Sequence, residues 1–217
     1  MSLCFSAGEF ACPVWHRSAN AKQVDIALNE TCRIISGCLK PTPLNKLYPL
    51  VGIAPPSVRR DVACAIEKKN QESDSRHPLF EHKTVPGRLK SRKSFLRGTK
   101  AILDPPPKER LRLWEEHYLP PPDFLKPQEH LPPGHELQWP VWKALNRLRT
   151  QVGRCKHNLA KWGFKDPSDT QCECGASVQN MSHTLECPKC PNTCTLEDLM
   201  SVTDAAISVA TYWAQTI

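Results

Sequence analysis

The first 70 residues carry apolar side chains at the spacing of amphipathic helices. From Asn20 onward these side chains recur near helical spacing, at Val24, Leu28, Ile34, Ile35 and Leu39. The pattern predicts one helix. Gly37 is a suitable end for it, because glycine readily adopts the left-handed conformation that follows many helices.

Two proline-containing stretches predict further helix starts in the same region. Thr42 followed by Pro43 resembles an N-cap with proline at the first helical position, and predicts a short helix through Leu50. Pro55 and Pro56 precede a third apolar face, formed by Val58, Val62, Ala65 and Ile66. Residues 1–70 are therefore expected to form a small helical cluster in a mostly α-helical protein.

Residues 71–140 contain twelve of the 21 prolines in the chain. This density disfavours long helices and central strands, so an extended or disordered linker is predicted. The linker is basic, with ten Lys and Arg residues between Lys83 and Arg112 against Asp104 and Glu109. Its densest part is Lys90, Arg92, Lys93 and Arg97. Either a solvated linker or an arm that contacts nucleic acid fits this composition.

The third segment, residues 141–217, begins with a long apolar stripe. Its members lie alternately four and three residues apart, at Val141, Leu145, Leu148, Val152, Cys155, Leu159 and Trp162. That spacing predicts one continuous amphipathic helix. A last helix is predicted for about residues 195–214, with Glu197 and Asp198 near its positively polarised start. The last helix is expected to pack on the first one.

The polar side of the predicted helix at 141–162 is entirely basic, since no Asp or Glu occurs between Leu137 and Lys165. Like charges repel along a helix, so a solvated face normally mixes both signs. Contact with phosphate groups is one explanation and plain solvation is the other. The residues expected to contact nucleic acid are Lys143, Arg147, Arg154, Lys156 and Lys161. Trp162 is a candidate for base stacking, although its place on the apolar stripe favours core packing.

A formal net charge of +7 modestly favours a polyanionic partner. The first residues lack the basic start of a secretory signal, and no apolar run reaches the roughly 18 residues of a membrane span. We therefore expect an intracellular protein, in the cytoplasm, the nucleus or both, with its 11 cysteines as thiols. The scattered cysteines are expected to be small buried side chains: Cys4, Cys12, Cys32, Cys38 and Cys64.

Five cysteines and one histidine lie between Cys172 and Cys194. Cys172 and Cys174 can hold one edge of a tetrahedron, and His183 and Cys187, one helical turn apart, can hold the other. Gly175 suits the tight turn that such a knuckle needs. Cys190 remains a rival ligand, because it forms a conventional pair with Cys187. The cluster predicts a closed, structural Zn²⁺ site.

The sequence offers little for catalysis. It contains no phosphate-binding Gly-rich loop, no Gly-x-Ser-x-Gly motif and no tight acidic pair suited to two-metal chemistry. No small-molecule substrate is therefore expected.

Two parts of the chain resemble one family. Residues 9–62, from EFACPVWHRSANAKQVDIALNETC to PPSVRRDV, resemble the segment after the polymerase palm in reverse transcriptases of jockey-type non-LTR retrotransposons. The stretch ALNRLRTQVGRCKHNLAKWGF, followed by CECG, MSHTLECP and CTLEDL, resembles the C-terminal zinc-knuckle region of the same polyproteins. By position, the family's knuckle ligands correspond to Cys172, Cys174, His183 and Cys187. The resemblance therefore disfavours Cys190 and Cys194 as metal ligands.

The resemblance implies a C-terminal fragment of an RNA-directed DNA polymerase, with a thumb-like or connection-like first segment. The family's Tyr-x-Asp-Asp turn is absent from the sequence, so no polymerase activity is expected of this chain alone. The implied partners are RNA or DNA and the remainder of the element's polymerase. The alternative is a protein–protein adaptor that uses the zinc knuckle together with Pro105–Pro107 and Pro120–Pro122.

Overall fold

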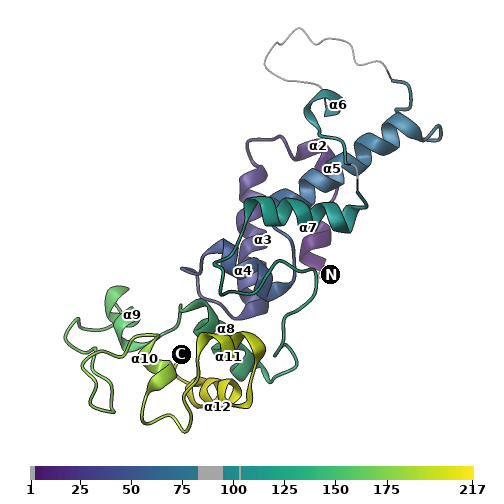
Figure 1. Ribbon diagram of the computed structural model, residues 1–217. Helices are drawn as coiled ribbons and strands as arrows, with labels where there is room; N and C mark the ends of the chain where they lie inside the picture. Colours follow the sequence, from purple (N-terminus) through teal and green to yellow (C-terminus); the bar gives the residue numbers. More distant parts are fainter. Residues whose placement is uncertain (1–2, 83–94, 103) are drawn as a thin grey trace. The chain divides into compact units, whose positions relative to one another are not determined.

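The computed structural model describes residues 3–82, 95–102 and 104–217, and within them it contains twelve helices and no strand (Figure 1). The expected mostly α-helical class is thereby confirmed. Three of the four residues in the densest part of the basic segment, Lys90, Arg92 and Lys93, lie outside the described residues, and the fourth, Arg97, is in a short helix. Among the described helices, none is long and apolar enough to cross a membrane.

The chain divides into two compact units, each made of two stretches of sequence. The first unit comprises Met1–Asn29 and Ala54–Tyr118, and the second comprises Glu30–Ile53 and Leu119–Ile217. These borders differ from those of the predicted segments 1–70, 71–140 and 141–217. Helix α3 (Ala21–Ser36) begins in the first unit and ends in the second.

The first unit is built around α5 (Pro56–Ser73), which packs against α2 (Cys12–Trp15) and α7 (Pro106–His117). Two short helices, α1 (Leu3–Gly8) and α6 (Phe95–Gly98), belong to the same unit. Its buried apolar residues include Phe5, Cys12, Val58, Val62, Cys64, Ala65 and Trp114. The apolar face predicted for the third helix is thus buried at Val58, Val62 and Ala65.

Prolines begin two helices of this unit. Pro55 is the N-cap of α5 and Pro105 is the N-cap of α7. Proline is tolerated in a first helical turn, because its missing N–H has no intrahelical partner there. A twelve-residue helix therefore lies inside the proline-rich segment, and Pro105–Pro107 form its start.

Helix α3 ends where the sequence predicts. Gly37 follows its last residue with φ +69°, the left-handed conformation that favours glycine. A side chain at this position would also collide with Lys143, whose Cγ lies 2.6 Å from where a Cβ would stand. Helix α4 (Leu44–Val51) starts one residue later than expected, since Pro43 and not Thr42 is its N-cap.

The second unit is built around α8 (Trp139–Thr150), which packs against α12 (Asp204–Trp213), α11 (Leu196–Ser201) and α4. Two short helices complete it, α9 (Lys156–Lys161) and α10 (His183–Glu186). One core joins α8, α10, α11 and α12, and it includes Trp142, Leu145, Leu148, Cys155, Leu185, Leu199, Val209 and Trp213. The expected packing of the last helical region on α8 is confirmed.

The continuous helix predicted across 141–162 is wrong. α8 ends at Thr150, and Gln151 adopts the left-handed conformation at φ 60°. Gly153 then passes so close to the C-terminal residues that a Cβ there would lie 2.5 Å from the Ile217 side chain. The helix predicted for about 195–214 is likewise divided into α11 and α12, because Val202 turns the chain at φ 59°.

Most scattered cysteines are buried, as expected. Cys12, Cys32, Cys38 and Cys64 are buried thiols. Cys4 is exposed, which corrects the expectation for that residue.

Candidate metal centre and the adjoining basic cleft

A tight turn positions the first two cysteines. The backbone N–H of Cys172 donates to the carbonyl of Ala176 at 2.9 Å, and the N–H of Gly175 donates back to the carbonyl of Cys172 at 3.0 Å. Gly175 has φ +95°, which side-chain-bearing residues rarely adopt. The turn therefore places Cys174 two residues after Cys172 without a clash.

Helix α10 positions the other two residues of the cluster. His183 opens the helix, and Cys187 follows it one turn later as the C-cap. The side chain of Asn180 accepts a hydrogen bond of 2.8 Å from the backbone N–H of His183. Within α10, the carbonyl of Thr184 accepts a hydrogen bond of 2.8 Å from the indole of Trp213. The core helix α12 thus holds α10 in place.

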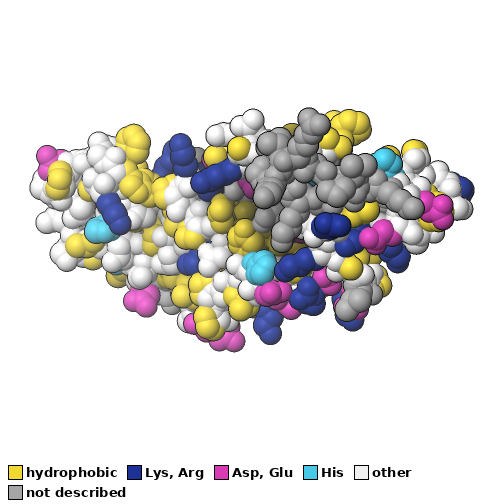
Figure 2. All heavy atoms as spheres, turned by 90° about the horizontal axis from the view of Figure 1, so that it is seen from above, with side chains coloured by type: hydrophobic (Ala, Val, Ile, Leu, Met, Phe, Trp, Pro, Cys, Tyr) yellow, Lys and Arg dark blue, Asp and Glu magenta, His cyan; other side chains and the backbone are white. Residues whose placement is uncertain are grey.

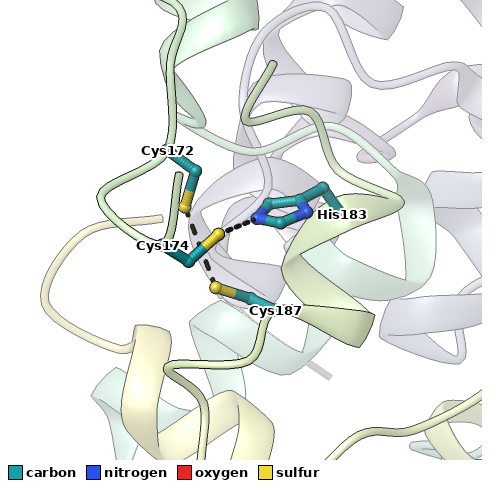
Figure 3. Close-up of side chains that lie close together, drawn as sticks. All are labelled: Cys172, Cys174, His183 and Cys187. Atoms are coloured by element: carbon teal, nitrogen blue, oxygen red, sulfur yellow. Dashed lines mark hydrogen bonds between the residues drawn. The ribbon is translucent and has the colours of Figure 1, made fainter. Parts of the chain in front are cut away.

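The four side chains converge on one point (Figure 3). All their donor atoms lie within 4.8 Å of one another. The Sγ atoms of Cys172 and Cys187 are 3.8 Å apart, and Cys174 Sγ is 3.3 Å from His183 Nε2. A tetrahedral ion with ordinary Zn–S and Zn–N bonds has edges of about 3.8 Å between sulfurs and about 3.6 Å between sulfur and nitrogen. The group can therefore hold a metal ion, and its donors are those that zinc accepts.

Cys190 and Cys194 do not belong to this group. Both are buried in the core of the second unit. Burial raises the pKa of Cys190, and it raises that of Cys194 to about 11, so both remain protonated thiols at neutral pH. Within the part of the chain that the structure describes, Cys172, Cys174, His183 and Cys187 are the only residues that form such a group.

The paired thiols have opposite pKa shifts. Burial raises the pKa of Cys172, but hydrogen bonds from the Cys174 backbone and from His183, Cys174 and Gln179 outweigh it and bring the pKa to about 6. Burial and the nearby Cys172 raise the pKa of Cys187 to about 11. One thiolate in a close pair disfavours a second one. A bound cation removes this conflict, because thiolates are the form that binds a metal.

Gln179 links the cysteine turn to α9. Its side-chain amide donates to Cys172 Sγ at 3.6 Å, and its side-chain oxygen accepts from the backbone N–H of Lys156 at 3.1 Å. Its own carbonyl accepts from the N–H of His157 at 3.1 Å. Such contacts orient a ligand from outside the donor set.

Two arginines of α8 are buried and donate to backbone carbonyls, and they do not lie on an exposed face. Arg147 donates to the carbonyls of Gly37 and Ile217. Arg149 donates to the carbonyls of Leu199 and Pro133, each at 2.8 Å. They are only 8% and 1% exposed, respectively.

Burial lowers the pKa of both guanidinium groups, that of Arg149 to about 10. Their acceptors include carbonyls at or just beyond the C-terminal ends of α3 and α11, which carry partial negative charge. The expectation that Arg147 lies on an exposed basic face is therefore corrected.

The other predicted basic residues have different surroundings. Lys143 is half-buried against Gly37, and Lys161 is exposed on α9. Trp162 is the half-buried C-cap of α9. Arg154 and Lys156 line a cleft of about 360 Å³ that also contains the metal-group residues Cys172 and Cys187.

Sequence reasoning missed several residues of this cleft. Lys165, Lys189 and Tyr212 also line it, and they come from three separate segments of the chain. Only the fold brings them together, so neither spacing nor periodicity indicated them. Figure 2 shows Lys and Arg side chains beside acidic and apolar ones on the face that it draws.

Comparison with known proteins adds no assignment. No protein-family model matches the chain, and no curated protein or solved structure is significantly similar to it.

Proposed function

We propose that this chain binds RNA or DNA through a structural zinc knuckle and the basic residues beside it, as the C-terminal part of a jockey-type retrotransposon polymerase polyprotein. The observation that carries the proposal is the convergence of Cys172, Cys174, His183 and Cys187 at the wall of a cleft lined by four cations. The resemblance of both parts of the sequence to that family supports it.

Zinc is the metal that suits the donor set. Three thiolates and one imidazole are soft and borderline donors, which favour zinc over magnesium or calcium. The four protein ligands complete a tetrahedron and leave no position for a reacting water. The ion's role in this proposal is therefore to hold the Cys172 turn against α10, not to catalyse a reaction.

Arg154 is the cation best suited to contact phosphate. Its side chain is exposed, and it makes no ion pair or hydrogen bond with any other residue that the structure describes. Glu173 also lines the cleft, but its printed ion pair is with Lys189 and not with Arg154. A guanidinium group binds phosphate oxygens in a bidentate way, which favours this contact further.

The test is binding of the full chain to a labelled 12-nucleotide RNA and to DNA of the same sequence, measured by fluorescence anisotropy. Affinity for the preferred strand should fall about tenfold or more between 50 and 200 mM salt, because phosphate contacts release counterions. Arg154→Glu should weaken binding clearly. Lys126→Glu, the same charge reversal at an exposed residue outside the cleft, is the matched control and should have a smaller effect.

Two results would contradict the proposal. One is an affinity that does not change with salt, and the other is a zinc-loaded chain that binds neither strand. The second result would favour the adaptor function instead.

A further inference from the structure

The cleft beside the metal group combines cations with an accessible aromatic ring. Tyr212, near the end of α12, is 41% exposed and lines the cleft together with Arg154 and Lys156. Its ring stands edge to face against Trp213, with centroids 4.9 Å apart and an interplanar angle of 87°. The buried indole of Trp213 is itself fixed by its hydrogen bond to Thr184. Tyr212 is therefore an aromatic ring supported by Trp213 in a cleft whose lining also includes four cationic side chains and the carboxylate of Glu173.

The lysines of the cleft have acidic neighbours, but these pairs are at the surface. Lys165 contacts Asp169 at 2.5 Å, and Lys156 lies 3.8 Å from the same carboxylate. Lys189 lies 3.9 Å from Glu173. The two carboxylates are 50% and 74% exposed, so the pairs contribute little stability and the lysines can turn to another anion.

The dimensions and chemistry of the cleft fit one unit of a nucleic-acid strand. A volume of about 360 Å³ lies at the lower end of the range for small-ligand pockets. A base stacks on an aromatic ring whatever its sequence, and the adjoining phosphate needs cations such as Arg154 and Lys156. A paired base cannot reach such a ring without leaving its own stack.

We infer that the cleft binds a single unpaired nucleotide of an RNA or DNA strand, with its base stacked on Tyr212 and its phosphate held by Arg154 and Lys156. This inference rests on the proposed nucleic-acid binding and adds a preference for single strands. Because Cys172 and Cys187 form part of the same wall, the metal group holds one side of the nucleotide site.

The experiment compares single strands with a duplex, using the full zinc-loaded chain. Fluorescence anisotropy gives the affinities for a 12-nucleotide RNA, for DNA of the same sequence and for the corresponding duplex. Tyr212→Ala should lower the affinity for a single strand about tenfold and leave that for the duplex unchanged. Tyr212→Phe keeps the ring and should retain wild-type affinity. The strand that shows the larger loss, RNA or DNA, identifies the source of the nucleotide.

Trp139→Ala is the matched control, because Trp139 is a 51% exposed aromatic residue of the same unit that does not line the cleft. It should leave all affinities unchanged. Equal binding of single strands by Tyr212→Ala and wild type would overturn the inference while the proposed function stands. An equal loss for single strands and duplex would also overturn it, since stacking is then not what Tyr212 provides. A wild-type chain that binds no nucleic acid would refute both.

Discussion

Both compact units bury arginine side chains, but they satisfy them with different acceptors. In the first unit, Arg59 donates to the Glu9 carboxylate at 2.7 Å and Arg60 donates to Asp25 at 3.0 Å. In the second unit, Arg147 and Arg149 donate mainly to backbone carbonyls. The same side chain therefore stabilises one unit through carboxylates and the other through carbonyl groups.

This difference explains the stretch of the second unit that lacks acidic residues. A stretch with basic residues but without Asp or Glu suggests a surface that binds a polyanion. In α8, however, the carbonyls of Gly37, Leu199 and Pro133 replace the missing carboxylates. Basic residues that point to nucleic acid must therefore be sought where the chain leaves them exposed, as at Arg154.

The largest difference between the two units is expected when the metal is removed. If the proposed zinc ion holds the two cysteines of the turn together with His183 and Cys187, a chelator should abolish the amide protection of the turn and of α10. Structural zinc contributes on the order of 10 kcal/mol in small domains. Helices α5 and α7 should keep their protection, since the metal group has no residue in the first unit. Hydrogen exchange of the full chain followed by mass spectrometry measures both. Unchanged protection in residues 172–187 would contradict the expectation.

The next largest effect is expected from Arg149→Met. The change leaves the buried carbonyl of Leu199 and the part-buried carbonyl of Pro133 without this donor, so the free energy of unfolding of the second unit should fall by about 3 kcal/mol. Arg149→Lys should rescue little of this loss, because an ammonium group lacks the guanidinium fork. Urea unfolding, followed by tryptophan fluorescence, gives the values. Lys161→Met, at an exposed site, is the control and should change stability by less than about 0.5 kcal/mol.

A smaller effect is expected in the first unit. Asp25→Asn removes the carboxylate opposite Arg60 but preserves the size of the side chain, and should cost about 1 to 2 kcal/mol. Glu72→Gln removes a half-exposed partner of Lys68 and should cost less than about 0.5 kcal/mol. Urea unfolding of both variants checks the order. An equal effect of the two changes would mean that the Asp25 contact is an ordinary surface pair.

The smallest effect concerns the start of α11. Thr195 and Asp198 form a reciprocal capping box, so Thr195→Ala should destabilise the second unit by about 1 kcal/mol. Thr211→Ala is the control, because its hydroxyl only bonds to Ile207 within α12.

The same capping box predicts a pH dependence. Hydrogen bonds from Thr195 lower the pKa of Asp198 below its usual value of 3.8. The stability that this carboxylate contributes is therefore present above about pH 4 and is lost as the pH falls through the lowered pKa. In Thr195→Ala this part of the acid dependence should shrink, which acid titration followed by circular dichroism measures. If the acid dependence of stability is the same in Thr195→Ala and in the wild type, the capping box does not cause it.

Local signals in the sequence predict the elements that local chemistry determines. Gly37 ends α3 and Pro55 caps α5, because left-handed glycine and proline in a first helical turn are properties of those residues themselves. The metal group is predictable for the same reason, since a turn at Gly175 and one turn of α10 bring its ligands together.

Features that depend on distant segments were not predictable from periodicity. The apolar stripe continues past Thr150, but Gly153 must pass close to Ile217, and the helix stops first. Arg147 looks solvated in sequence because its carbonyl acceptors lie at distant positions of the chain. The position of Tyr212 in the cleft was not predictable either, because the other lining residues come from distant segments of the chain.

The central claim is that four residues form one zinc site in the second unit. Elemental analysis of the purified full chain tests it most directly, beside the variants His183→Ala and Cys190→Ala. We predict one zinc per chain for the wild type and for Cys190→Ala, and loss of zinc with His183→Ala. His183 belongs to the convergent group of four residues, whereas Cys190 does not. A folded wild-type chain without zinc, or loss of zinc on replacing Cys190 but not His183, would contradict the account.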